Sequence, residues 1–135
     1  MKLLRRRERE TGAAAVEFAL VAPVMIALMF GIVEFGVAFN YKTTVNNYAA
    51  VTARSYSIDP ATQPASPAER KALAATALGI SPADVLTDPV ASLDCTLTAN
   101  RGQRFTVEIR VKRRTLTGFP RQEFTYSGKG LGLCA

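Results

Sequence analysis

An apolar run near the N-terminus constrains the fold more than any other feature of the sequence. Residues 13–39 read AAAVEFALVAPVMIALMFGIVEFGVAF, and Glu17 and Glu34 are the only charged residues among them. The hydrocarbon core of a bilayer is about 30 Å thick, so a helix of this length spans it with some tilt and places each glutamate near a boundary. A buried helix in a soluble protein is the alternative, but the rest of a 135-residue chain is too small to enclose it. We therefore predict a transmembrane helix at 13–39.

The charge on the two flanks predicts the orientation of this helix. Residues 1–12 form a basic leader with five Lys or Arg against two Glu, whereas the opposite flank offers only Lys42 and Arg54. The positive-inside rule places the N-terminus in the cytoplasm and the C-terminal domain outside the cell membrane. A secretory signal peptide is an alternative with the same charged start, but its apolar segment is usually shorter, about 7–15 residues.

The residue types that the chain lacks argue against catalysis. The sequence has no histidine, the commonest general base and metal ligand, and no glycine-rich phosphate loop. Two cysteines, Cys95 and Cys134, are too few for a structural zinc site. We therefore expect no enzyme activity, no cofactor and no metal. For the cysteines two interpretations stay open, a disulfide in an oxidising compartment or two free thiols.

The junction between the leader and the apolar run resembles a known family. The stretch RRRERETG, ending at Gly12, and the following AAAVEF, which contains Glu17, resemble a type IV prepilin. Residues 5–58 resemble more narrowly the TadE-like proteins of the tight-adherence (Flp) pilus system. The resemblance implies that a prepilin peptidase cuts between Gly12 and Ala13. It also implies that Glu17, the fifth residue after the cut, directs assembly with other pilin-like subunits and the pilus assembly machinery.

Each of these positions also has a physical interpretation and a simpler alternative. Gly12 offers the least hindrance to a peptidase groove, or else it is a helix cap or a linker. Glu17 is costly in an apolar helix unless it is paired. The Ala13 ammonium of a neighbouring subunit would pair with it and fix the axial stagger, whereas Arg9 or water would otherwise neutralise it. Glu34 either bonds to a partner helix or faces water.

A row of small residues predicts a face for helix packing. The row recurs every four positions: Ala15, Ala19, Pro23, Ala27 and Gly31. Small residues at this spacing let membrane helices approach closely, although chance could also produce the row in an alanine-rich segment. We also expect Pro23 to kink the helix or loosen its hydrogen bonds.

The remaining chain predicts a small extracytoplasmic domain and hence an α+β fold. Helical spacing continues over 40–58 and a proline-rich linker follows at 59–67, which leaves residues 68–135 for the domain. Start and stop signals predict a short helix from Pro67 to Leu78 and a further helical turn after Ser81.

Near residue 93 the pattern changes to the period of two that is typical of strands. Alternation over 93–98, a turn at 100–103 and alternation over 105–111 predict an antiparallel hairpin or small sheet. A third strand is expected near Gln122–Tyr126. We expect the tail from Pro120 on to be irregular because it also carries Gly128, Gly130 and Gly132.

Four basic residues cluster at the end of the second alternating run: Arg110, Lys112, Arg113 and Arg114. Clustered charge would suit phosphate, but the alternation fits a solvated strand face better, so nucleic acid is not the partner that we expect. The sequence thus predicts a membrane-anchored, pilin-like subunit that is cut after Gly12. Two other interpretations stay open: an uncleaved single-pass binding module with a basic hairpin, and a membrane-attached enzyme.

Overall fold

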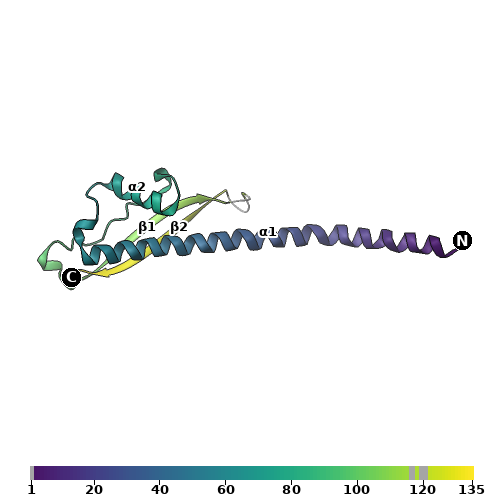
Figure 1. The fold of residues 1–135 in the computed structure, drawn as a ribbon, viewed down its shortest axis with the longest axis horizontal. Helices are drawn as coiled ribbons and strands as arrows, with labels where there is room; N and C mark the ends of the chain where they lie inside the picture. Colours follow the sequence, from purple (N-terminus) through teal and green to yellow (C-terminus); the bar gives the residue numbers. More distant parts are fainter. Residues whose placement is uncertain (1, 116–117, 119–121) are drawn as a thin grey trace. The chain divides into compact units, whose positions relative to one another are not determined.

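The fold was analysed in a computed structural model that describes the backbone of residues 2–115, 118 and 122–135, with side chains from Gly12 on. The chain divides into two compact units, one up to Gly36 and one from Val37 on. The main elements in chain order are α1 (Lys2–Ile58), α2 (Pro67–Leu78), β1 (Arg104–Arg114) and β2 (Glu123–Leu133) (Figure 1). A long apolar helix, a short helix and a two-stranded antiparallel sheet confirm the predicted α+β class.

The last five turns of α1 supply one wall of the second unit's core. The buried residues of this part of the helix lie three or four positions apart: Tyr41, Val45, Ala49, Ala53 and Tyr56. This spacing places them on one helix face, as the sequence pattern predicts. Tyr48 and Thr52 are half-buried beside that face.

The two strands present one face to α1 and α2. Phe105, Val107, Ile109 and Val111 of β1 are buried, and each pairs with a residue between Tyr126 and Gly132 of β2. A Cβ atom on Gly130 would lie 2.0 Å from the Ala49 carbonyl oxygen, and one on Gly128 would lie 2.5 Å from that of Val45. The glycines therefore allow the backbone of α1 to lie directly on β2.

The expected irregular tail is therefore wrong, because Gly128, Gly130 and Gly132 belong to a regular strand. The residues expected to form a third strand near Gln122–Tyr126 begin β2, which is the direct partner of β1. Pro120 lies outside the described residues.

The predicted pairing of 93–98 with 105–111 is also wrong. The carboxylate of Asp94 accepts hydrogen bonds from the backbone N–H and the hydroxyl of Thr96, at 2.9 and 2.7 Å. Such local bonds compete with a strand ladder and favour a turn. The free edge of β1 is covered instead by residues 85–92, where Leu86 N–H donates to the Arg110 carbonyl at 2.8 Å and Ser92 N–H to that of Thr106 at 2.9 Å.

The short helices form where their start and stop signals lie. Helix α2 begins at Pro67, directly after Ser66, and ends before Gly79, which has a left-handed φ of 64°. Ala74, Ala75 and Leu78 of α2 share a core cluster with residues of α1 and β1. A short 3-10 helix, η2, spans Pro82–Asp84, where the Ser81 hydroxyl accepts a hydrogen bond from the Ala83 N–H. These two predictions are confirmed.

Candidate functional site

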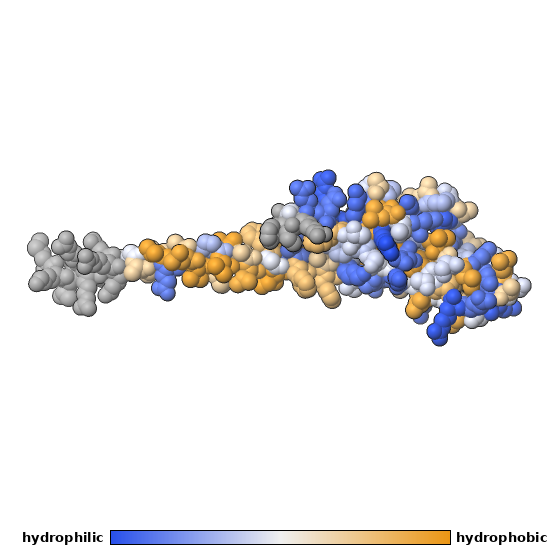
Figure 2. Space-filling view, turned by 180° about the vertical axis from the view of Figure 1, so that it is seen from behind, coloured by the Kyte–Doolittle hydropathy of each residue, from blue (hydrophilic) through white to orange (hydrophobic). Residues whose placement is uncertain are grey.

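The first candidate site is the surface of α1 before Val37. Ala22 and Glu34 are half-buried and every other residue of 12–36 is exposed. Among the described residues, one helix (Gly12–Ile58) is long and apolar enough to cross a membrane. Figure 2 shows apolar surface along this segment. A helix with apolar side chains on every side is stable where its surroundings are also apolar, as in a bilayer.

The expected cleavage position lies inside α1. Gly12 and Ala13 are both helical, so a peptidase that binds an extended chain would first have to unwind this turn. A Cβ atom on Gly12, on Gly31 or on Gly36 would meet nothing within 4 Å. The chain's own packing therefore gives no reason for glycine at these three positions, in contrast to Gly128 and Gly130.

The two membrane glutamates are not brought together. Glu17 is exposed and Glu34 is half-buried. Seventeen helical positions separate them by about 25 Å along the axis, so they do not act as a pair of carboxylates.

The small-residue row lies on the exposed surface of the helix. All five of its members are exposed: Ala15, Ala19, Pro23, Ala27 and Gly31. Residues four apart form a ridge inclined to the helix axis, so such a row fits a partner helix that crosses at an angle. The helix continues through Pro23 without interruption, although proline has no N–H to offer the Ala19 carbonyl.

The basic cluster on β1 is divided between the two faces of the sheet. On the outer face, Arg110 lies 3.0 Å from Glu108, while Lys112 and Arg114 lie 3.9 and 3.7 Å from Glu123. The hydrogen bond from Arg110 holds the pKa of Glu108 below its ordinary value.

On the face toward α1, the Arg113 guanidinium carbon lies 4.4 Å from the centre of the Tyr41 ring. The four basic side chains thus do not share one face of the sheet.

The two cysteines are joined. Cys95 and Cys134 form a disulfide with their Cα atoms 5.0 Å apart. The backbone around it is also bonded, since Gly102 N–H donates to the Cys134 carbonyl at 2.8 Å and Cys134 N–H to that of Gln103 at 3.0 Å. The phenolic oxygen of Tyr56 accepts a hydrogen bond from the Cys95 N–H at 3.2 Å. The end of β2 is therefore fastened both to the 95–103 loop and to α1.

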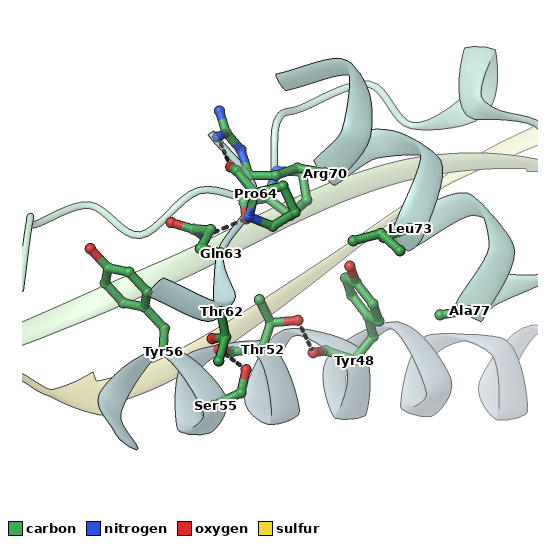
Figure 3. A pocket seen from close by; sticks show the side chains of 11 residues that line it. Tyr48, Thr52, Ser55, Tyr56, Thr62, Gln63, Pro64, Arg70, Leu73 and Ala77 are labelled. Atoms are coloured by element: carbon green, nitrogen blue, oxygen red, sulfur yellow. Dashed lines mark hydrogen bonds between the residues drawn. The ribbon is translucent and has the colours of Figure 1, made fainter. Parts of the chain in front are cut away.

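A cavity of about 300 Å³ lies between α1 and α2, and Figure 3 shows the side chains that line it. Tyr48, Thr52 and Leu73 contribute to a lining that is mostly apolar. Arg70 lies at its edge and is already occupied, because it forms a two-point salt bridge with Asp88. Within the described part of the chain, no group of three His, Cys, Asp or Glu residues could hold a metal ion.

Two features of the structure differ from what the sequence predicts. The Arg70–Asp88 pair has no signal in the sequence, because 18 positions and an irregular segment separate its members. The close approach of α1 to β2 does have one. Gly128, Gly130 and Gly132 alternate as the residues of a single strand face do, and this spacing could have identified it.

Comparison with known proteins finds one family similar to the N-terminal part of the chain. The family model of TadE-like proteins matches residues 12–54 and confirms the resemblance from Gly12 through the apolar helix, while the basic leader lies outside the match. No curated protein and no solved structure matches the chain. The match supports a pilus-associated, pilin-like component with one membrane-capable helix and a C-terminal domain.

Proposed function

We propose that this TadE-like chain is cut after Gly12 by a prepilin peptidase and then acts in the assembly of a tight-adherence (Flp) pilus or a related secretion apparatus. Its role is structural, without catalysis. Its leader lies in the cytoplasm and its C-terminal domain is extracytoplasmic. The observation that carries the proposal is the TadE-like match over residues 12–54, which includes the expected cleavage site and the whole apolar segment.

The exposed helix surface supports a role in association with other helices. Gly12, Gly31 and Gly36 have open space around them, so nothing among the described residues requires their small size. A second helix that packs closely would use that space, because small residues let two backbones approach. The inclined row from Ala15 to Gly31 is the surface that we assign to this contact.

Glu17 has a specific task in this scheme. Cleavage leaves a new ammonium group on Ala13, one helical turn before Glu17. In a bundle of such helices, the ammonium of one subunit pairs with the Glu17 carboxylate of its neighbour. Because an unpaired charge in an apolar bundle is costly, this pair excludes wrong axial registers and sets the stagger between subunits.

The cleavage step is tested by the mass and N-terminal sequence of the protein recovered from native cell membranes. We expect a chain that begins at Ala13. Replacement of Gly12 by a bulky residue, as in Gly12→Leu, should leave the leader in place. An intact leader on the native protein, with the peptidase present, would contradict the mechanism and favour the alternative of an uncleaved anchored binding module.

The assembly step is tested with Glu17→Gln, which keeps the size and removes the charge. We expect membrane insertion and cleavage to persist while crosslinking to other pilin-like subunits is lost. Glu69→Gln is the matched control, since Glu69 is an exposed carboxylate on α2 of the second unit. Normal crosslinking of the Glu17→Gln protein would show that Glu17 is only an interfacial residue.

A further inference from the structure

The second unit holds the ends of its two strands beside the first turn that follows the apolar segment. Arg113, near the end of β1, lies with its guanidinium carbon 4.4 Å from the centre of the Tyr41 ring. Tyr126, near the start of β2, packs edge-on against the same ring at 5.0 Å. Lys42 donates a hydrogen bond from Nζ to the Ser127 carbonyl. Tyr41 and Lys42 therefore fix this end of the sheet to the helix.

This position corresponds to the headgroup layer of a bilayer. The apolar segment ends at Phe39, and a helix rises about 1.5 Å per residue, so Tyr41 and Lys42 lie about 3–5 Å beyond its end. Hydrocarbon and headgroups together measure about 40–45 Å against about 30 Å for hydrocarbon alone, which leaves several ångströms of headgroup on each side. The strand ends packed on Tyr41 are then at the depth of the lipid phosphates.

The side chains at this end carry an excess of positive charge. Lys42, Lys112, Arg113 and Arg114 are basic, whereas the carboxylates that the described residues place here are Glu123, beside Lys112 and Arg114, and Asp84, near Tyr41. We name these four basic residues the basic collar. Arg114 is 87 % exposed and Lys112 is 38 % exposed, and both approach Glu123 only at 3.7–3.9 Å. Exposed ion pairs at these distances are weak, so Lys112 and Arg114 stay available to another anion.

We propose that the basic collar contacts the phosphate groups of anionic phospholipids at the membrane surface from which the domain emerges. Arginine suits this task because its planar guanidinium binds phosphate oxygens at two points. The contact would hold the domain at a fixed height and rotation above the bilayer. This inference rests on the membrane-spanning helix of the proposed function and is independent of cleavage after Gly12.

The inference is tested on the full chain in nanodiscs of phosphatidylcholine, with or without phosphatidylglycerol. Hydrogen–deuterium exchange is followed in the peptides that cover residues 111–115 and 122–126. We expect exchange to slow in the anionic discs and to recover at high salt. Each basic residue near an anionic surface strengthens binding to that surface by about fivefold. Loss of two basic residues should therefore reduce the protection from exchange by at least an order of magnitude.

Lys112→Gln with Arg114→Gln is the test variant, because neither side chain packs in the core. The matched control is Arg101→Gln with Arg104→Gln, which removes the same charge from exposed positions where β1 begins. The control should keep the lipid-dependent protection and the test variant should lose it. Equal exchange in both kinds of disc would overturn the proposal, as would equal protection by soluble polyphosphate in phosphatidylcholine discs. Failure of the chain to enter discs would contradict the anchor itself, whereas an uncleaved leader would leave this result unchanged.

Discussion

The guanidinium of Arg113 stacks on the ring of Tyr41, with 4.4 Å between its central carbon and the ring centre. The ring is only 4 % exposed and also meets Tyr126 edge-on. Its hydroxyl is buried and makes no hydrogen bond of good geometry within the described part of the chain, although the Arg113 guanidinium lies close enough to counter part of the burial effect on its pKa. The ring therefore contributes packing and a cation–π contact, while the hydroxyl gains little in exchange for its lost hydration.

Tyr41→Phe should for this reason leave stability unchanged or raise it slightly. The substitution removes the buried hydroxyl and keeps the ring contacts with Arg113 and Tyr126. Tyr41→Ala, in contrast, should cost about 3–5 kcal/mol because it removes the ring. Both are measured by denaturant unfolding of the full chain in detergent micelles. A loss above about 1 kcal/mol for Tyr41→Phe would reveal a partner for the hydroxyl, such as a bound water.

Alkaline pH should destabilise the second unit through two phenols, one buried and one half-buried. Burial raises the pKa of Tyr41 and of Tyr48 above the ordinary value of 10.0. The folded state therefore holds these protons more tightly than the unfolded state, so their contribution is complete below pH 10 and is lost as pH rises through the folded pKa values. The free energy of unfolding should fall above about pH 10, and the fall should be shallower in Tyr48→Phe. An unchanged slope in that variant would exclude Tyr48 as a source of the effect.

Gly130→Ala should disrupt the contact between α1 and β2. The new Cβ would lie 2.0 Å from the Ala49 carbonyl oxygen, so backbone must move against backbone. Overpacking of a core costs about 1–3 kcal/mol even where side chains can adjust, and here they cannot. Thr125→Ala on the exposed face of the same strand is the control and should change the unfolding midpoint little. Equal stability of the two variants would mean that α1 does not lie on β2 in this way.

The sequence predicts the parts of the fold that depend on local signals. Helix α2 was predicted because Ser66, Pro67 and Gly79 mark its ends within the segment itself. The partner of β1 was not predicted. Alternation gives 93–98 and 123–133 similar strand character and does not indicate which of them pairs with β1. The hydrogen bonds from Thr96 to the Asp94 carboxylate favour a turn at 93–98, which leaves 123–133 as the partner of β1. The three glycines predicted to form an irregular tail pack against a helix about 80 positions earlier in the chain, and their alternation indicates a strand face but not which element lies on it.

The Cys95–Cys134 disulfide should stabilise the second unit substantially. The bond closes a loop between residues 39 positions apart. A loop of this size restricts the unfolded chain by about 3–4 kcal/mol. We expect the Cys95→Ser, Cys134→Ser double variant to unfold at a lower denaturant concentration and to match the reduced wild-type protein. Equal unfolding midpoints for the double variant, the reduced protein and the oxidised protein would show that the bond does not stabilise the second unit.

The salt bridge between Arg70 and Asp88 should be the polar contact on which the position of α2 depends most. Arg70 donates from Nε to one oxygen of Asp88 at 2.8 Å and from a terminal nitrogen to the other, and it also donates to the Ala65 carbonyl at 2.9 Å. Its side chain is 10 % exposed and that of Asp88 is 25 % exposed, so the pair is shielded from water. The hydrogen bond with Asp88 raises the pKa of Arg70.

Arg70→Lys keeps the positive charge but cannot bind both oxygens of Asp88 at two points. It therefore tests the two-point geometry and not the charge. Hydrogen bonds to charged groups contribute about 1.5–3 kcal/mol, so we expect Asp88→Ala to lose about that much and Arg70→Lys to lose roughly half as much. Lys71→Ala, one position along α2, is the matched control for a lost cation. Denaturant unfolding gives the three values. If Arg70→Lys proves as stable as wild type, simple charge attraction is sufficient and the two-point geometry has no energetic role.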